Sequence, residues 1–390
     1  MSTNKKIDLV FYGDFGLRIG KGEEVLETAK ALFKESLLGK VYVRDKGLAL
    51  RTEFERYIIS PIPGGSFLPR ILALIKKFFL PSFQSRIWGE RLFDYFTSQK
   101  LKKESQIIYM TTGSSLTLKK AKKLGFKVGL HCGVLHPSYI LDLIKEEFSK
   151  FNLVFKSQSL INSLRDYQKN LSLADFIVVH SNFAKENYIQ YGVPPEKIFV
   201  NPLGINLEEF KPIPLTAGSK KEKIFIFIGG VVLLKGVHYL LEAWKQLNLK
   251  DAKLIVCGNK EMDDWLLVKK YWRLPNVEFP GFVNPKDYYH KALAFVFPSL
   301  TEGFSRVVGE ALASGLPVVT TPVAAHLVRD GIDGFIIPIR DIEAIKEKIL
   351  YFYNNLEKAI EMGNSARQRA EEFTWQAYRE NFLKIIRNFL

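Results

Sequence analysis

The sequence of 390 residues has few cysteines and no long hydrophobic run. Cys132 and Cys257 are the only cysteines, which excludes a small disulfide-stapled fold, and we expect a reducing compartment. No apolar stretch approaches the ~20 residues that span a bilayer, and the opening residues MSTNKK contain no signal-peptide core. We therefore expect a cytoplasmic protein.

Several binding signatures are also missing. The chain has neither the G-x-G-x-x-G fingerprint of dehydrogenases nor the G-x-x-x-x-G-K-[ST] loop of phosphate-cleaving motors. Zinc-finger spacing, an RNP-type aromatic motif and long basic runs are absent too, so a nucleic-acid partner is disfavoured. Because no Asp-x-Asp pair occurs, we expect no catalytic metal ion, and we expect no cofactor.

Positive charge is concentrated in the first half. The net charge is +15, and residues 1–205 hold 31 Lys and Arg against 19 Asp and Glu. Residues 66–103 interleave eight basic residues with bulky apolar ones at roughly helical spacing. That pattern is typical of a helix on an anionic membrane surface, where each basic residue contributes ~1 kcal/mol; a core-packed helix with a solvated basic face is the alternative. We expect the membrane-facing residues to be Arg70, Lys76, Lys77, Arg86 and Arg91.

Short β-branched runs alternate with longer amphipathic stretches, which predicts parallel sheets covered by helices on both faces. The pattern restarts at residue 223, after a Pro-containing polar stretch. Strands are expected at residues 7–12, 107–111, 127–131, 176–180 and 198–201, and then at 223–229, 253–258, 277–279, 294–298 and 317–320. We therefore expect an α/β fold of two doubly wound, Rossmann-like domains that face each other across a cleft. The expected units are a basic acceptor-side domain (1–207), a nucleotide-sugar-binding domain (208–372) and a helix (373–390) that packs back towards the first domain.

A glycine turn opens the second half. The strand at 223–229 runs into Gly229 and Gly230, and Lys235 precedes an expected helix at 237–247. Such a turn offers backbone N–H groups and the positive end of a helix dipole to an anion, and Lys235 adds a full charge. The pattern predicts a diphosphate site, with a purely structural turn as the alternative.

Two glutamates stand eight residues apart, in PSLTEGFSRVVGEA. Glu302 follows a strand, and Glu310 lies a little over two helical turns later, so both carboxylates can face one cleft. We expect Gly303 to Arg306 to begin the helix and to offer free N–H groups to a phosphate oxygen. Carboxylates accept hydrogen bonds from sugar hydroxyls, which fits a nucleotide sugar; two acids that merely favour the helix dipole are the alternative.

In combination, these motifs resemble those of retaining glycosyltransferases of the GT-B fold, in the large family four (glycosyl transferases group 1). The resemblance covers almost all of residues 170–385. Glu302 and Glu310 stand as the family's E-x7-E motif, preceded by PSLTEGF and followed by ALASGLPV. The segments ADFIVVHS, YGVPPEKI and NPLGIN also match in order.

The resemblance implies transfer of a hexose-type sugar from a nucleotide diphosphate sugar to a hydroxyl of a lipid-linked or surface-glycan acceptor, with retained configuration. It implies that Glu310 binds the ribose hydroxyls and that Glu302 and His131 act at the transferred sugar. His136 is a nearby competitor of His131. The other implied donor-binding residues are Gly229, Gly230, Lys235, Gly303, Phe304, Ser305 and Arg306, and Gly20 and Gly22 resemble the glycine loop of the first domain.

The chain departs from the family pattern at the phosphate loop. Gly230 stands where the family usually has Arg, and we expect Arg306 to compensate from the other side of the diphosphate. Ala324 and Ala325 replace the usual glycine pair in a region taken as structural. Two other functions stay open: a nucleotide-sugar epimerase of the same fold, and a non-catalytic sugar-nucleotide-binding subunit, which Gly230 would suit.

Overall fold

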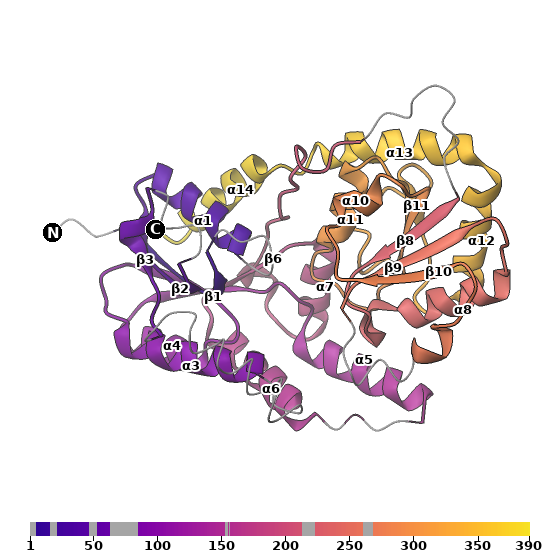
Figure 1. The fold of residues 1–390 in the computed structure, drawn as a ribbon. Helices are drawn as coiled ribbons and strands as arrows, with labels where there is room; N and C mark the ends of the chain where they lie inside the picture. Colours follow the sequence, from indigo (N-terminus) through magenta and orange to yellow (C-terminus); the bar gives the residue numbers. More distant parts are fainter. Residues whose placement is uncertain are drawn as a thin grey trace.

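Two parallel sheets, each in its own half of the molecule, organise the part of the chain that the structure describes (Figure 1). The computed structural model describes residues 5–15, 22–46, 53–62, 85–152, 155, 157–212, 223–259 and 268–390. Helices cover both faces of each sheet, as parallel strands with apolar side chains on both faces require. The predicted pair of Rossmann-like domains is thereby confirmed, while the exact domain limits stay a prediction.

The first sheet has the strand order β3-β2-β1-β4-β5-β6-β7. Its strands are β1 (Ile7–Asp14), β2 (Leu38–Asp45), β3 (Ile58–Ile59), β4 (Ile107–Thr111), β5 (Lys127–His131), β6 (Phe176–Val179) and β7 (Ile198–Val200). The helices are α1 (Gly22–Lys34), α3 (Ser85–Lys100), α4 (Ser115–Lys123), α5 (Pro137–Lys150), α6 (Gln158–Leu173) and α7 (Asn182–Gln190), with 3-10 turns η2 (Glu55–Tyr57) and η3 (Pro195–Lys197). The sequence reading did not anticipate β2 and β3.

The second sheet has the order β10-β9-β8-β11-β12-β13. Its strands are β8 (Ile224–Ile228), β9 (Lys253–Cys257), β10 (Val277–Gly281), β11 (Ala294–Phe297), β12 (Val318–Thr320) and β13 (Gly334–Ile336). The helices are α8 (Val237–Leu247), α10 (Lys286–Tyr289), α11 (Arg306–Ala313), α12 (Ile342–Asn354) and α13 (Leu356–Ala370), with 3-10 turns η4 (Leu233–Lys235) and η5 (Lys269–Tyr271). The strands β8, β11 and β12 are neighbours, so the loops that follow them meet at one edge.

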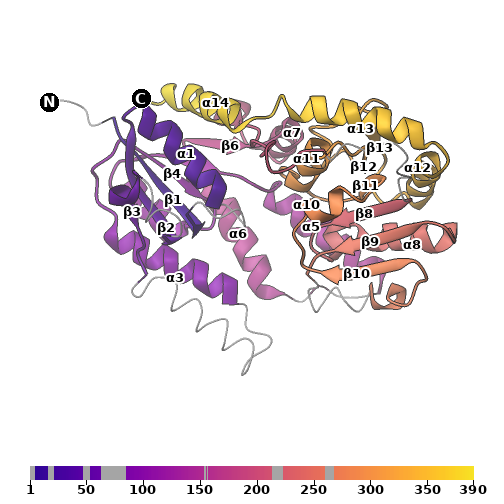
Figure 2. The same cartoon turned by 45° about the horizontal axis from the view of Figure 1, so that its top comes forward.

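The last helix, α14 (Trp375–Arg387), leaves the second domain and lies along α1 of the first (Figure 2). Phe382 and Ile386 are fully buried in the first domain's core, and the Tyr378 hydroxyl lies 2.8 Å from Thr28 Oγ1 on α1. The expected return of the C-terminal helix is therefore confirmed.

The chain passes between the domains twice, and the two passages lie side by side. The Ile205 amide donates to the Phe373 carbonyl at 2.9 Å. A Cβ atom added to Gly204 would come within 2.5 Å of Trp375. The two connections therefore form one pair of adjacent segments.

The basic segment is described only from α3 onwards. Arg70, Lys76 and Lys77 lie outside the described residues, and only the backbone of Arg86 is described. On α3, Phe93 is buried against the sheet while Arg91 is exposed. Within the described part of the chain, none of the helices combines the length and the hydropathy that a bilayer crossing would need.

Candidate active site

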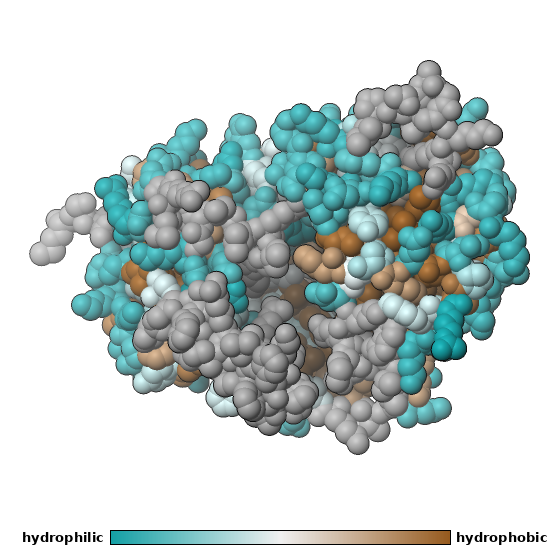
Figure 3. Space-filling model, viewed as in Figure 1, coloured by the Kyte–Doolittle hydropathy of each residue, from teal (hydrophilic) through white to brown (hydrophobic). Residues whose placement is uncertain are grey.

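The carboxyl ends of the two sheets line a cleft between the domains, and the face drawn in Figure 3 is hollowed between the two halves. Glu23 of α1 lines a pocket there together with residues of the second domain and its linker, namely Gly204, Ile205, Asn206, Phe210, Phe304, Arg306 and Glu310. Ligands of open α/β sheets bind at such an edge, which makes this cleft the candidate site.

Glycines let the loop after β8 lie against its neighbours. Gly236 has a φ of +67°, and a Cβ atom there would lie 1.9 Å from the carbonyl oxygen of Pro298, at the end of β11. A Cβ atom on Gly258 would lie 1.7 Å from the carbonyl oxygen of Gly229. At Gly230, in contrast, an added Cβ would meet only Val232, at 3.8 Å. The close approach at Gly236 brings Lys235 to the loop that carries Glu302.

Lys235 and Glu302, predicted as neighbours on the donor, contact each other directly. Lys235 Nζ lies 2.5 Å from Glu302 Oε1, which also accepts a hydrogen bond from Ser299 Oγ at 3.1 Å. Both side chains are largely shielded, with 28% and 11% of their surface exposed. An incoming diphosphate would therefore compete with Glu302 for the ammonium group.

The second glutamate lies on α11. Glu310 is buried, and its Oε2 accepts a hydrogen bond from the Tyr289 hydroxyl at 3.3 Å. The helix start was expected within Gly303 to Arg306, and α11 begins at the last of these residues, with Ser305 as its N-cap residue in an extended conformation; Gly303 and Phe304 lie in the loop before it. The hydroxyl of Ser305, at the start of α11, is buried and has no hydrogen-bond partner among the described residues.

Arg306 contacts the first domain. Its guanidinium forms an ion pair with the Glu23 carboxylate in the first turn of α1. Acidic residues at this position also favour the helix dipole. In the absence of a ligand, Arg306 thus joins the two sides of the cleft, and its compensating role at a diphosphate stays a prediction.

The loop between β11 and α11, residues 298–305, is called the donor loop below, and it touches the loop that follows β5. A Cβ atom on Gly303 would lie 2.4 Å from the carbonyl oxygen of Gly133, so glycine is required for this approach. Ser181 Oγ donates to the Gly303 carbonyl at 3.1 Å. The backbone expected to hold the sugar is therefore in contact with both β5 and β6 loops.

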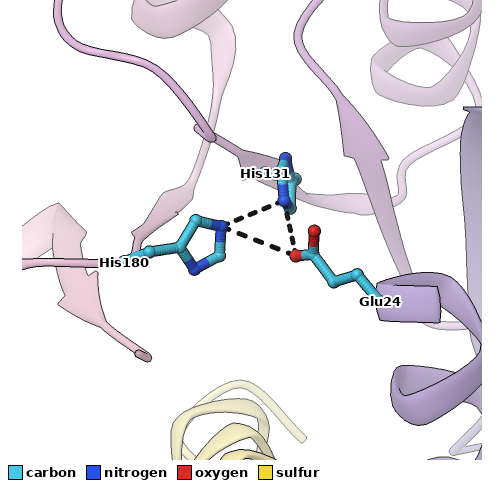
Figure 4. A group of neighbouring side chains, drawn as sticks. All are labelled: Glu24, His131 and His180. Atoms are coloured by element: carbon cyan, nitrogen blue, oxygen red, sulfur yellow. Dashed lines mark hydrogen bonds and ion pairs between the residues drawn. The ribbon is translucent and has the colours of Figure 1, made fainter. Parts of the chain in front are cut away.

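His131 ends β5 and belongs to a buried group with Glu24 and His180 (Figure 4). Its Nε2 lies 2.5 Å from Glu24 Oε1 and 3.0 Å from His180 Nε2. His136, the competing histidine, instead caps α5 by accepting from the Ser138 amide at 3.3 Å, and burial lowers its pKa to about 4. Of the two histidines, His131 contacts other titratable side chains, whereas His136 caps a helix.

Sequence reasoning missed Glu24, His180 and His326. His180 directly follows a strand next to β5, a position that the rule used for His131 would have selected. His326 packs against Phe304 with the two rings tilted and their centroids 4.3 Å apart, and burial together with nearby His180 lowers its pKa to about 3. Neither of its ring nitrogens has a hydrogen-bond partner among the described residues. The stretch around Ala324, interpreted as structural, thus brings a polar group to the donor loop.

The glycine loop of the first domain is described in part. Gly20 lies outside the described residues. Gly22 is the first residue of α1 and is buried, directly before Glu23 and Glu24. Its predicted approach to a donor stays a prediction.

Most of the second domain matches a known family. Residues 215–369 match the glycosyl transferases group 1. The capsular polysaccharide biosynthesis glycosyltransferase CapM of Staphylococcus aureus is 32% identical over 228 residues, which cover 55% of this chain and 59% of CapM. The chain thus matches less than two thirds of the length of this relative.

Two solved structures share the fold along nearly the whole chain. Sucrose-phosphate synthase from Thermosynechococcus elongatus has a TM-score of 0.67 and 19% identity, with 98% of each chain covered. HepE of Anabaena, in complex with UDP and glucose, has a TM-score of 0.67 and 17% identity, with 98% of this chain and 99% of HepE covered. These likenesses confirm the GT-B arrangement of the two domains.

Proposed function

We propose that the protein is a retaining glycosyltransferase of family four. It transfers a hexose-type sugar from a nucleotide diphosphate sugar to a hydroxyl of a lipid-linked or surface-glycan acceptor. The observation that carries the proposal is the contact of Lys235 with Glu302 at the carboxyl edge of the second sheet, with buried Glu310 on the helix that follows. The group 1 match of residues 215–369, CapM's role in capsular polysaccharide biosynthesis and HepE's complex with UDP and glucose support it.

In this proposal the donor takes over contacts that the protein now makes with itself. The diphosphate binds Lys235 beside the turn at Gly229 and Gly230, whose Gly229 amide donates to the Cys257 carbonyl, so Glu302 is released to accept hydrogen bonds from the sugar. Glu310 accepts from the ribose hydroxyls. The buried hydroxyl of Ser305, which lacks a partner among the described residues, donates to the donor at the start of α11.

The chemistry is charge stabilisation. Negative charge grows on the leaving diphosphate, and Lys235, once released from Glu302, stabilises it. His131 and Glu302 orient the sugar as its reacting carbon becomes cationic. These groups provide the required electrostatics without a metal ion or a cofactor.

We further propose that the first domain attaches to the cytoplasmic face of an anionic membrane and so reaches its acceptor there. The support is its surplus of basic residues and the outer surface of α3. On that helix Trp88 and Tyr95 are each 49% exposed, and the Arg91 guanidinium lies 5.9 Å from the Trp88 ring centroid. Amphipathic aromatic rings flanked by basic groups suit a headgroup region.

The test is donor binding by matched variants. Thermal-shift screening with UDP, GDP, ADP and their sugars identifies the donor, because a ligand at 100 times its Kd stabilises by ~2.7 kcal/mol. Lys235→Ala and Glu310→Ala each remove a charged contact worth about 1.5–3 kcal/mol, so calorimetry is expected to show roughly 10- to 150-fold weaker binding. The exposed Lys245→Ala and Glu357→Ala are the matched controls.

Two outcomes contradict the proposal. Unchanged donor affinity in both site variants would remove the site assignment. Conversion of the donor sugar to its epimer without any acceptor would identify an epimerase instead of a transferase.

A further inference from the structure

The group of Glu24, His131 and His180 joins three elements at the carboxyl edge of the first sheet (Figure 4). Glu24 lies in the first turn of α1, His131 ends β5, and His180 directly follows β6. The side chains are almost completely buried, with 5%, 1% and 1% of their surface exposed. Buried groups of this kind are costly unless each atom has a defined hydrogen-bond role.

The hydrogen positions follow from one backbone contact. His180 Nδ1 lies 2.8 Å from the carbonyl oxygen of Asn201, which can only accept, so Nδ1 carries a proton. In neutral His180 the other nitrogen, Nε2, is then an acceptor. It faces His131 Nε2 at 3.0 Å, so the proton between the rings belongs to His131. Glu24 Oε1 lies 2.5 Å from the same nitrogen, as its ion-pair partner.

The last helix fixes both partners of His131. Asn381 on α14 donates to Asn201 Oδ1 and to the Val200 carbonyl, each at 2.9 Å, and so holds the residue whose carbonyl orients His180. On the other side, Thr28 Oγ1 donates to the Glu24 carbonyl at 2.8 Å and contacts the Tyr378 hydroxyl of α14.

The ring of His131 also packs against Gly133, the residue whose carbonyl contacts the second domain. A Cβ atom on Gly133 would come within 2.8 Å of His131 Cε1. The carbonyl of the same glycine lies against Gly303 of the donor loop. Gly133 therefore couples the orientation of the His131 ring to Gly303, in the segment that is proposed to hold the sugar.

The spacing favours a hydrogen-bonded group over a metal site. Two His and one Glu are a possible zinc ligand set, but ligand atoms ~2.0–2.1 Å from a tetrahedral ion lie about 3.3 Å apart. The distance of 2.5 Å between Glu24 Oε1 and His131 Nε2 is shorter than that, so these two atoms are not spaced as ligands of one tetrahedral ion, whereas the two histidines stand at hydrogen-bond distance.

We propose that Glu24 and His180 are positioning residues that hold His131 with its proton on Nε2, which leaves Nδ1 as an acceptor for a sugar hydroxyl. This inference rests on the proposed function, in which His131 acts at the transferred sugar. In general, the hydrogen bond made by one ring nitrogen of a histidine determines the protonation of the other nitrogen.

The first test reads the tautomer without any turnover. Proton–nitrogen correlation spectra of ¹⁵N-histidine-labelled full-length protein are recorded, and the His131 signals are assigned by their loss in His131→Gln. We expect the Nε2–H form in the native protein and a changed pattern in His180→Leu. An Nδ1–H form of His131 in the native protein, or one zinc ion per chain by elemental analysis, would overturn the proposal.

The second test separates kcat from binding. With UDP-glucose, GDP-mannose and ADP-glucose as probes, His180→Leu and Glu24→Gln are expected to lower kcat at least about tenfold, while the Kd of the nucleoside diphosphate stays unchanged. His180→Gln, which keeps an acceptor near the Nε2 position, is expected to recover part of kcat, with circular dichroism confirming folding. Unchanged kcat in both variants would refute positioning. If the native protein transfers no sugar at all, the proposed function fails, and the spectra still decide the tautomer.

Discussion

Gly236 shows how the donor site depends on a single backbone position. Its φ of +67° is a left-handed conformation, which costs a residue with a Cβ atom roughly 1–2 kcal/mol. The Cβ atom would also lie 1.9 Å from the Pro298 carbonyl oxygen. Conformation and close approach thus demand glycine independently, directly next to Lys235.

A pair of substitutions separates these two effects. Gly331 has a φ of +74°, but nothing lies within 4 Å of an added Cβ. Gly331→Ala is expected to lower the free energy of unfolding by roughly 1–2 kcal/mol, and Gly236→Ala by clearly more, because its backbone clash adds to the same conformational cost. Urea unfolding of both variants measures the difference. Equal losses would show that the loop around Gly236 relaxes freely.

At the residue scale, the sequence singled out residues within one motif but not their contacts. Glu302 and Glu310 stand out as a pair eight residues apart, although only Glu310 lies on α11, and Lys235 stands out from its glycine turn. The pairing of Arg306 with Glu23 could not be predicted, because it joins the two domains and no local pattern relates them. For the same reason, the contacts of His131 with Glu24 and His180 depend on the order of strands in the sheet.

At the element scale, the prediction succeeded for strands that are long and apolar throughout. β4, β8 and β11 are buried at each position and were expected within one residue of their observed ends. β2 was missed because Lys40 and Arg44 interrupt its apolar pattern. β3 has only two residues, and β13 opens on Gly334 and is only partly buried beyond it, so neither shows the apolar run that marks the similarly short β7 and β12.

Helix α5 links the first domain to the second through a buried carboxylate. Glu147 accepts from the Tyr239 hydroxyl at 3.0 Å and from Arg340 Nε at 2.6 Å, with Lys150 Nζ at 3.0 Å and His238 Nε2 at 3.6 Å. Burial alone would raise the pKa of Glu147, but His238 and the other donors and cations outweigh it and lower the pKa to about 2.

The Glu147 carboxylate is expected to make the free energy of unfolding depend on pH in the acidic range. Because the pKa falls from the ordinary 4.5 to about 2 on folding, ionised Glu147 contributes about 3 kcal/mol above pH 4.5, which is lost as pH falls towards 2. Urea unfolding should therefore show Glu147→Gln well below the native protein at pH 7 and much closer to it at pH 3. The exposed Glu186→Gln is the control. A gap of constant size across this range would contradict the prediction.

At the scale of the whole molecule, two adjacent connections and a few cross-cleft contacts set how the domains face each other. The passages at Ile205 and Phe373 are hydrogen-bonded to each other, which favours bending about one shared hinge. The contacts of Arg306 with Glu23 and of Gly303 with Gly133 lie on the cleft side of that hinge. Donor entry therefore requires these contacts to open or rearrange.

The proposed membrane attachment rests on the uneven charge of the two halves of the chain. Co-sedimentation with vesicles of phosphatidylcholine containing phosphatidylglycerol is expected to rise with the anionic fraction and to fall with salt. Arg91→Glu should weaken it, because one basic contact of ~1 kcal/mol is replaced by repulsion. The exposed Lys245→Glu in the nearly neutral second half is the matched control. Binding that ignores anionic lipid would refute the proposed attachment.

The position of α14 also has a consequence for how the chain is made. Synthesis on the ribosome delivers residues in order, and domains generally fold as they emerge. Here β1 and α1 appear early, yet Phe382 and Ile386, which complete the core against them, appear only after the entire second domain. The first domain to emerge is thus the last to be finished, and its apolar face must stay protected from aggregation until translation of the final helix.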